Sequence, residues 1–472
     1  MRRRVAALTL ASLTAACTVG PDYKPDELDV PSTWTEQQPS PVDKAAADAA
    51  LKDWWAAFKD PLLDRLIAQA IAGNDDLKLA RQRLIQARAG RAVAASVDYP
   101  QVKAAAARLQ SNSSTTVDYP PGIGQYRTWE LGFDASWELD VFGGTKRAEE
   151  AADAEIGAAI EDRRTILVSL LAEVAGDYAS LRTSQLRLAI AERNIEAARK
   201  GLDLTQQEFQ RGLGTDLEVA QARAQWNNVR SAPPPLKASV ARLSHAIGVL
   251  VGGFPGDLEA ELSKPAALME VPANLPVALP SETLANRPDI RRAERRYAAA
   301  TARIGVATAA LFPHFEIPLM IDPTSATLSS LLLAKSLDWN LGLEASGLIY
   351  DGGKTDAQIE SAKAAAESAR IAYEQTVRNA FRDVEDALVN FSTETERNST
   401  LKEAASDSDQ ALDRATRLYG AGLTDFLKVL DSERAAFTAE DVEAQSRLAK
   451  VQDVIALFKA LGGGWQGVTF ED

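Results

Sequence analysis

The amino-acid sequence predicts a mainly α-helical protein with a membrane β portion. In this fold a long coiled-coil helical barrel is continuous with a twelve-stranded transmembrane β-barrel shared by three chains. Three observations lead to this fold class. The second half of the chain repeats the first, each half carries one unusually long helical pattern, and each half carries a pair of strands with one apolar face. Duplication of this kind indicates one architecture with internal pseudo-symmetry.

Matching motifs recur along the chain at a spacing of about 210 residues. The pairs are Tyr99-Pro100 with Phe312-Pro313, Gly143-Gly144 with Gly352-Gly353, and Thr215-Asp216 with Thr424-Asp425. An apolar series repeats as well: Leu167, Leu171, Val174, Tyr178 and Leu181 correspond to Val377, Phe381, Val384, Leu388 and Phe391. We therefore assign residues 62–251 to repeat 1, 252–283 to a Pro- and Gly-rich linker, and 284–472 to repeat 2 with the C-terminal tail.

Long helical patterns fill most of each repeat. The first repeat predicts helices over 62–97, 145–211 and 216–250, the last with a kink at Pro233-Pro234-Pro235. The second predicts helices over 282–310, 354–420 and 425–461. The longest, of about 67 residues, contain no Pro, extend about 100 Å at 1.5 Å per residue, and carry a heptad stripe typical of supercoiled helices. Trp54, Trp55 and Phe58, just before the first helix, are expected to anchor in a core.

Period-two alternation predicts a strand pair in each repeat. Residues 125–140 alternate Leu131, Phe133 and Trp137 with polar side chains, and the partner strand is expected over 101–110. Residues 337–349 alternate Trp339, Leu341 and Leu343 with polar side chains, and their partner is expected over 314–321, made irregular by Pro318. The apolar faces are expected to meet lipid, and Tyr126, Trp129 and Tyr350 to lie in interfacial belts.

Four strands cannot close a barrel, and an open sheet edge in lipid leaves backbone groups unpaired at a cost of several kcal/mol each. Three chains would supply twelve strands, a number within the range of outer-membrane barrels. The strand pattern therefore predicts a homotrimer.

The N-terminus reads as a secretory signal over residues 1–16: Arg2, Arg3 and Arg4 precede a short apolar run that ends at Cys17, the chain's one cysteine. Leu13 to Cys17 resembles a bacterial lipoprotein box, in which the cysteine becomes the first mature residue and carries acyl chains such as palmitate. Thr18, which is not Asp, implies sorting to the outer membrane by that resemblance. Residues 17–61 are then a lipidated, Pro-rich extended arm. No later segment has about eighteen consecutive apolar residues, so no transmembrane helix is expected.

Composition excludes several function classes. The net charge of −14 gives no basic footprint for nucleic acid. The two histidines, His245 and His314, accompany no nucleophile elbow, phosphate loop or metal cluster, so we expect neither an enzyme nor a cofactor or metal. A periplasmic adaptor or structural coiled coil would not need two copies that each carry strands.

Taken together, the motifs resemble the TolC-type outer-membrane efflux family, and within it the lipoprotein branch often named for NodT or OprM. The resemblance covers essentially the whole mature chain. Its marks are the segments 17–23, 31–34, Trp54-Trp55, 137–143, 286–290 and 429–431. The resemblance implies a trimeric outer-membrane channel that extends into the periplasm. It would passively conduct small molecules from an inner-membrane pump of the resistance–nodulation–division type through a periplasmic adaptor, as in multidrug resistance. An exit duct for type I protein secretion shares this fold and stays open as an alternative.

The same resemblance assigns roles to two helix-reversing turns and to residues near them. The turns are expected to form the periplasmic tip that contacts the adaptor, through Gly212, Leu213, Gly214, Thr215, Gly420, Gly422, Leu423 and Thr424. The gate is expected at Glu218, Tyr419, Lys428 and Asp431. Lys428 and Thr424 depart from the TolC type, which has an acid and an arginine there, so the resemblance implies altered gate chemistry, with Lys428 and Asp431 pairing across the axis.

Overall fold

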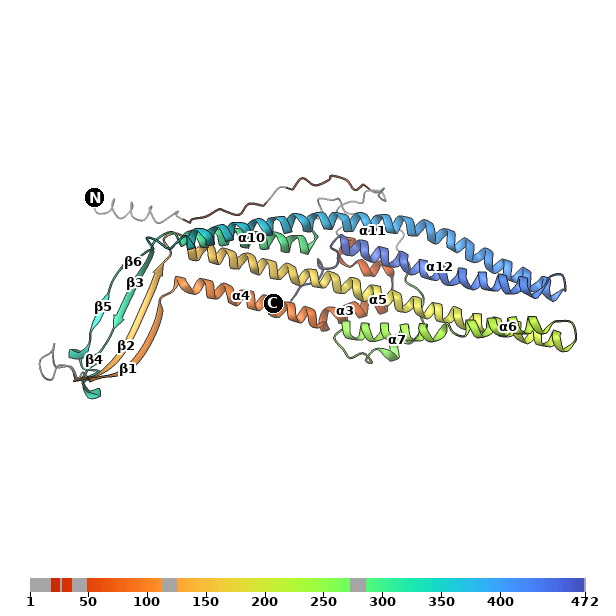
Figure 1. Cartoon of the computed structure of the whole chain (residues 1–472), viewed down its shortest axis with the longest axis horizontal. Coiled ribbons are helices and arrows are strands. Elements are labelled where there is room, and N and C mark those ends of the chain that lie inside the picture. Colours follow the sequence, from red (N-terminus) through yellow and green to blue (C-terminus); the bar gives the residue numbers. More distant parts are fainter. Residues whose placement is uncertain (1–17, 26–27, 36–48, 113–124, 272–285, 471–472) are drawn as a thin grey trace. The chain divides into compact units, whose positions relative to one another are not determined.

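The structure is a computed structural model, and it describes residues 18–25, 28–35, 49–112, 125–271 and 286–470 (Figure 1). The chain divides into two compact units. One comprises Met1–Glu27, Gln82–Ile160 and Arg292–Glu374, and the other Leu28–Arg81, Glu161–Arg291 and Gln375–Asp472. Each unit therefore takes segments from both halves of the sequence.

Helices dominate the described residues. In chain order the elements are η1 (Trp54–Phe58), α3 (Pro61–Gly73), α4 (Asp75–Ala95), η2 (Ser96–Asp98), β1 (Gln101–Asn112), β2 (Gln125–Leu139), α5 (Gly144–Gln210), α6 (Asp216–Val229), α7 (Pro233–Leu250), α8 (Glu259–Leu262), α10 (Pro288–Ala309), β3 (His314–Ile321), β4 (Thr324–Ser325), η3 (Leu328–Ser330), η4 (Ala334–Ser336), β5 (Trp339–Leu341), β6 (Glu344–Ser346), α11 (Lys354–Gly420) and α12 (Phe426–Ala460).

The two longest helices, α5 and α11, each have 67 residues and agree with the predicted bounds to within one residue. Both run without interruption because neither contains a proline. The predicted helix over 216–250 is instead two helices, α6 and α7, because α7 begins anew at Pro233. Proline is favoured at this first helical position, where its missing N–H would have no partner anyway. The break is thus sharper than the predicted kink.

The predicted continuous helix over 62–97 is also wrong, because the chain breaks at Asn74 between α3 and α4. The Asn74 backbone is extended (φ −63°, ψ 133°). Its side-chain oxygen accepts hydrogen bonds from the Asp76 and Leu77 N–H groups at 2.9 and 3.2 Å, and its amide donates to the Leu250 carbonyl at 3.0 Å. Asparagine competes well with helical hydrogen bonding at such a cap, and here a tertiary partner holds it.

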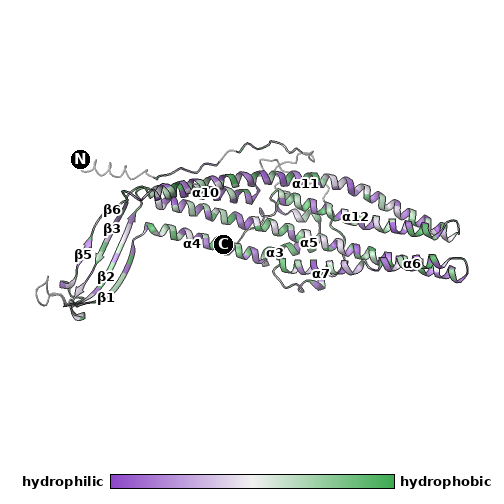
Figure 2. Cartoon of the chain, in the orientation of Figure 1, coloured by the Kyte–Doolittle hydropathy of each residue, from purple (hydrophilic) through white to green (hydrophobic). Residues whose placement is uncertain are grey.

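The first unit contains one antiparallel sheet in the order β1–β2–β3–β5, with β4 paired to β2 and β6 paired to β3. Its register places Phe133 of β2 beside Ala104 of β1 and Ile321 of β3. Residues directly opposite one another share a face, so the odd-numbered side chains of β2 lie with the apolar ones of β3. The strand predicted over 125–140 is confirmed as β2. Hydrophobic and hydrophilic residues are interspersed along the strands (Figure 2).

Two prolines interrupt the later strands without changing their register. β5 and β6 both pair with β3 in the same register, and the gap between them lies opposite Pro318. The Pro318 carbonyl accepts a hydrogen bond from the Gly342 N–H at 3.1 Å, but proline has no N–H to donate in return. Pro323 likewise separates β3 from β4, and its carbonyl accepts from the Leu131 N–H at 3.2 Å. The single strand predicted over 337–349 is therefore two short pieces that end at Ser346.

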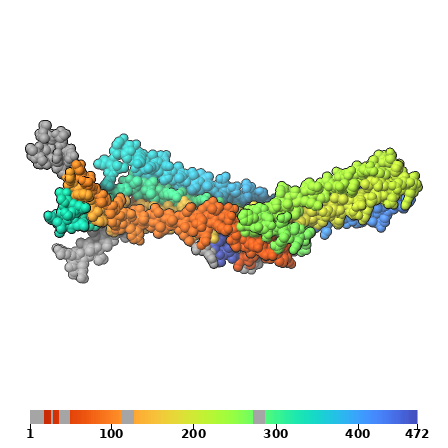
Figure 3. Space-filling model, turned by 90° about the horizontal axis from the view of Figure 1, so that it is seen from below, coloured from red at the N-terminus to blue at the C-terminus, as the bar shows by residue number. Residues whose placement is uncertain are grey.

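The second unit holds the main apolar core. Trp54 is 1% exposed and stacks on Phe458 of α12 with ring centroids 5.3 Å apart, so the anchoring expected of the tryptophan pair is confirmed. The Tyr178 hydroxyl of α5 donates to the Asp60 carboxylate, which also caps α3. In this unit α7, green in Figure 3, lies beside α3, orange-red in the same view. Apolar side chains of α3, α5, α7, α11 and α12 pack together there.

Candidate gate and contact surface at the two helix reversals

The first helix reversal joins α5 to α6 through residues 211–215 (Figure 1). Gly212 adopts a left-handed conformation with φ 70°. Its N–H donates to the Phe209 carbonyl at 3.0 Å, and the Leu213 N–H donates to the Glu208 carbonyl at 2.9 Å. This pair of bonds is the Schellman pattern, which satisfies the last carbonyls of a helix. Glycine suits the position because an L side chain there is strained.

The second reversal joins α11 to α12 and repeats this geometry. Gly422 has the same φ of 70°. Its N–H donates to the Tyr419 carbonyl and the Leu423 N–H donates to the Leu418 carbonyl, both at 2.9 Å. The eight residues predicted to contact an adaptor all lie in these two turns or, for Gly420, at the end of α11. The role itself stays a prediction.

The caps that start α6 and α12 differ between the repeats. Thr215 caps α6: its hydroxyl accepts from the Glu218 N–H at 3.3 Å, and the Glu218 carboxylate accepts from the Thr215 N–H at 2.7 Å. Asp425 caps α12 by accepting from the Lys428 N–H at 3.0 Å. Thr215 and Asp425 each follow the left-handed glycine by three residues, so they are equivalent. The Thr-Asp pairs that match in sequence are therefore offset by one residue in the structure.

Glu218 and Lys428 occupy the same position, the third helical residue after the cap. Glu218 completes a capping box with Thr215, in which each side chain satisfies the other residue's backbone N–H. A lysine has no acceptor with which to do so, and the Lys428 side chain is exposed. The structure thus gives the predicted gate residue Glu218 a capping role.

Tyr419 links the two reversals. Its hydroxyl donates to the Glu208 carboxylate in the last turn of α5, and its ring lies 5.5 Å from that of Phe426. Burial raises the pKa of the Tyr419 hydroxyl, and the bond to Glu208 and the charges of Glu208 and Glu218 raise it further. The phenol therefore stays a proton donor throughout the physiological pH range. The sequence predicted Tyr419 as a gate residue but did not indicate Glu208, because an acid near an exposed polar helix end gives no distinguishing signal.

Lys428 and Asp431 lie one turn apart on α12 and are both exposed. They form no ion pair with each other in the part of the chain that the structure describes. Leu430, between them, is buried with Phe426, Leu202 and Ala222, so the two charged side chains lie away from this cluster.

Glu433 is a second residue that sequence reasoning missed. It follows Phe426 and Leu430 at heptad spacing and is only 7% exposed. Burial raises the pKa of its carboxyl to about 7, although the charge of Arg434 opposes the shift. Arg434 itself donates to the Gln225 side chain of α6 at 2.9 Å. The sequence pattern that could have revealed Glu433 is a charged residue at a heptad position that otherwise carries buried apolar residues.

Each reversal also carries exposed leucines at equivalent positions. Leu213 and Leu423, each following a left-handed glycine, are 79% and 74% exposed. Leu217 and Leu427, at the second helical residue of α6 and α12, are exposed as well. The two turns therefore present similar apolar side chains to their surroundings.

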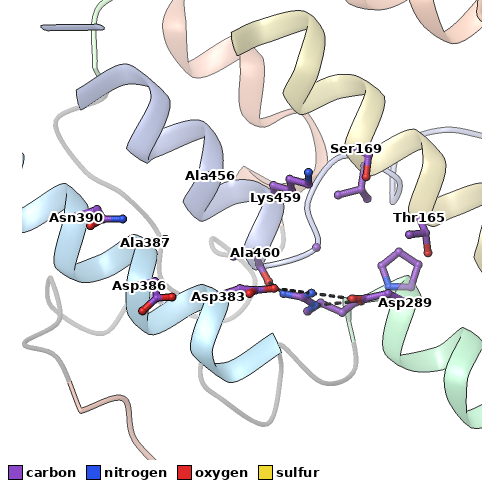
Figure 4. A pocket seen from close by; sticks show the side chains of 14 residues that line it. Thr165, Ser169, Asp289, Asp383, Asp386, Ala387, Asn390, Ala456, Lys459 and Ala460 are labelled. Carbon is purple, nitrogen blue, oxygen red and sulfur yellow. Dashed lines mark hydrogen bonds and ion pairs between the residues drawn. The ribbon is translucent and has the colours of Figure 1, made fainter. Parts of the chain in front are cut away.

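Arg287, in the predicted motif segment 286–290, forms a structural junction in the second unit. Its partners Asp289, Asp383 and Ala460 are labelled in Figure 4. Its buried guanidinium donates to Asp289 at 2.7 Å, to Asp383 of α11 at 3.2 Å and to the Ala460 carbonyl at 2.8 Å. The Asn286 carbonyl accepts from the Trp465 indole at 2.9 Å. The adjoining cavity, of about 360 Å³, is lined by these paired charges, so we assign the motif to joining α10, α11 and the end of α12.

Cys17 lies outside the described residues, so its lipid attachment stays a prediction. Within the described residues no helix has the length and apolarity needed to cross a membrane. The same residues contain no group of three or more His, Cys, Asp or Glu side chains placed to hold a metal ion.

Solved outer-membrane channels share this fold. The channel OprN superposes with a TM-score of 0.85 at 35% identity and covers 95% of this chain and 100% of its own. The open state of the MtrE outer membrane channel of Neisseria gonorrhoeae superposes with a TM-score of 0.84 at 26% identity, over 96% and 100% of the two chains. The fold is therefore that of an outer-membrane channel.

Sequence comparison identifies the family. The outer membrane efflux protein model matches residues 66–253 and 279–463. The cation efflux system protein CusC of Escherichia coli O6:H1 is 30% identical over 462 residues, which cover 97% of this chain and 98% of the relative. Nodulation protein T of Rhizobium leguminosarum bv. trifolii is 29% identical over 458 residues, 97% and 96% of the two chains. The chain belongs to the outer membrane efflux protein family, so the predicted family is confirmed.

Membership defines the function at the level of the family. The protein is an efflux channel of the outer membrane, and members of this family are channels rather than enzymes. The relatives' names span cation, toluene and antibiotic efflux. Names this diverse do not select a substrate class for this chain.

Proposed function

We propose that three copies of this chain form the channel and that their sheets close into one twelve-stranded β-barrel across the outer membrane. The observation that carries the proposal is the open sheet. Among the described residues, the outer edges of β1 and of the β5–β6 strand have no partner strand. The apolar face leaves large side chains exposed, with Trp339 at 65% and Val102 at 71%. Neighbouring copies would pair the edges, and lipid would cover the face.

In this proposal the channel is the passive exit duct of a tripartite efflux system. An inner-membrane pump of the resistance–nodulation–division type supplies the energy, and a periplasmic adaptor connects pump and channel. Relatives named for cation, toluene and antibiotic efflux support export of small molecules. The proposed duct performs no covalent chemistry and needs no cofactor or metal beyond the lipid on Cys17.

Deletion of the gene tests this function. We expect the deletion strain to accumulate a pump substrate such as ethidium or a toxic cation, and plasmid-borne wild-type protein to restore its export. Unchanged accumulation together with a lost secreted protein would instead identify the duct of a type I secretion system. Substrate accumulation should be compared with that in a strain lacking the pump.

The two reversals are the proposed adaptor surface. Leu213, Leu217, Leu423 and Leu427 are exposed at equivalent positions in both repeats, so one kind of adaptor surface would fit either turn. Buried leucines contribute about 1.5–3 kcal/mol each. Leu423→Ser should therefore weaken adaptor binding by roughly ten-fold or more without disturbing the fold, because its side chain packs on little of the chain itself.

The gate is proposed at Lys428 and Asp431, which would pair across the axis of the trimer, with Tyr419 holding α11 against α5. Exposed ion pairs contribute about 0.2–1 kcal/mol. Asp431→Ala and Lys428→Ala should each raise the open probability about two- to five-fold in single-channel recordings. Lys402→Ala, an exposed position on α11, serves as the control. If both gate variants conduct as the wild type does, Lys428 and Asp431 do not hold the closed tip.

A further inference from the structure

Arg147, near the start of α5, is a buried cation that binds residues 18–25. This first described segment of the extended N-terminal region is called the arm below. The Arg147 side chain is 4% exposed. Its guanidinium donates to the Val19 carbonyl at 3.1 Å, to the Gly20 carbonyl at 3.2 Å and to the Asp22 carboxylate at 2.7 Å. It also donates to Glu150 one turn along α5 at 2.7 Å. Hydrogen bonds that involve a charged group are strong. Removing the Arg147 guanidinium would leave the carbonyl and carboxylate oxygens that it binds without this donor.

Three glycines let the arm backbone approach this closely. A Cβ on Gly20 would lie 2.4 Å from the Gly305 Cα of α10, and one on Gly305 would lie 2.6 Å from the Arg147 Cγ. A Cβ on Gly143 would lie 2.8 Å from the Thr18 Cα. A Cβ atom does not pack closer than 3 Å to such neighbouring atoms, so a side chain at these positions would displace the arm. We call Gly143, Arg147 and Gly305 the arm groove.

Two further contacts hold the arm on either side of the guanidinium. The Val19 N–H donates to the Phe142 carbonyl at 3.1 Å, three residues after the end of β2. Farther along, the Tyr23 ring meets the Tyr297 ring edge-on at 5.3 Å, and the Tyr23 hydroxyl donates to Glu294 at 3.1 Å. The arm is therefore bound along most of its length.

We propose that the arm groove is a docking site for the first residues of the mature chain, which fixes where the lipid anchor leaves the protein, next to the end of β2. Val19 comes two residues after Cys17, and two residues of chain span at most about 7 Å. Acyl chains on Cys17 would start within that distance of the groove. The inference rests on the lipidation of Cys17 in the proposed function and assigns Arg147 as its positioning residue.

The groove itself is tested by proteolysis of purified protein in detergent. Chymotrypsin cleaves after tyrosine, and docking of Tyr23 should protect the Tyr23–Lys24 bond. Mass spectrometry should show cleavage there at least ten-fold faster in Arg147→Met and in Gly305→Ala, which changes a different helix. Arg303→Met, which changes α10 outside the arm groove and loses an exposed ion pair to Glu155 of α5, should cleave like the wild type. Wild-type rates in both groove variants would overturn the docking site.

A double-mutant cycle tests the link to the lipid. The chain is expressed with Cys17 intact, and with Cys17→Ala behind a signal peptide that is not of the lipoprotein type. Assembly into heat-dissociable oligomers is then followed by pulse-chase with and without Arg147→Met. We expect Arg147→Met to slow assembly several-fold in the lipidated chain and to add no further delay in the unlipidated one. An equal delay in both backgrounds would show that Arg147 acts only on the fold and would overturn the inference.

Radioactive palmitate separates this inference from the proposed function. Labelling of the wild type and not of Cys17→Ala is expected. Absence of label from the wild type would refute lipidation, and with it the role of the groove in placing an anchor. The chymotrypsin rates would still report whether the arm is docked.

Discussion

Glu433 shows how a single side chain can make the stability of the channel depend on pH. The carboxyl is buried at a heptad core position, and its pKa rises from an ordinary value near 4.5 to about 7. The folded state therefore binds a proton more tightly than the unfolded state does. The stabilisation is complete below about pH 4.5 and is lost as the pH rises through 7, because the buried carboxyl must then be charged. The full difference is about 3 kcal/mol per chain.

Glu433→Gln should remove this dependence. The neutral amide has a similar shape, so the variant should be more thermostable than the wild type at pH 8 and differ little from it at pH 5. Thermal unfolding of the detergent-solubilised protein at a series of pH values measures the effect. Glu403→Gln, an exposed position on α11 outside the proposed gate, is the control. A wild-type slope of melting temperature against pH in Glu433→Gln would contradict this account of Glu433.

At the scale of elements, the two reversals show that aligning the sequences of the two repeats assigns the wrong residue as the cap of α12. Sequence pairs Thr215 with Thr424, but the structure makes Asp425 the equivalent cap. In both turns the cap follows the left-handed glycine by three residues. The Thr-Asp pair of the second turn lies one residue closer to its glycine than the Thr-Asp pair of the first turn does. The sequence alignment is therefore shifted by one position. Cap identity is therefore set by turn geometry.

Thr215→Ala and Thr424→Ala form a matched pair that tests this assignment. Loss of an N-cap costs about 1 kcal/mol, or about five-fold in local opening. Amide hydrogen exchange in the first turn of α6 should accelerate by that factor in Thr215→Ala. The first turn of α12 should be unaffected by Thr424→Ala. Equal acceleration at both helix starts would show that the sequence alignment, and not the turn geometry, locates the caps.

Much of the element order could be predicted from patterns that depend on local chemistry. The bounds of α5 and α11 follow from uninterrupted heptads, and those of β2 from alternation. The break at Asn74 could not be predicted in this way, because the Asn74 amide is held by the Leu250 carbonyl, which is distant in sequence. Arg147 and Glu208 were missed for the same reason: their partners, in the arm and on α11, are brought close only by the fold.

At the scale of the whole molecule, the polar face of the sheet carries a row of acids. Glu138, Glu316 and Glu344 are directly opposite one another on β2, β3 and β6. His314 contacts Glu138 at 2.8 Å. Like charges directly across a sheet are destabilising, so water must solvate this face. In the proposed trimer the row would form a ring of carboxylates around the pore.

Such a ring predicts a preference for cations. Glu316→Gln should lower the ratio of cation to anion permeability, which is read as a smaller reversal potential across a planar bilayer with a potassium chloride gradient. Glu259→Gln in α8, outside the sheet, should leave the potential unchanged. An unaltered potential in Glu316→Gln would show that this row does not face the conducting pore.

Native mass spectrometry of the channel extracted from outer membranes measures the stoichiometry on which the whole account depends. We predict a complex of three chains, and hydrophobic photolabelling from the bilayer should reach Trp339 and Leu341 in it. A single compact chain, with Trp137 and Trp339 inaccessible to a lipid-borne label, would contradict closure of the barrel by three copies.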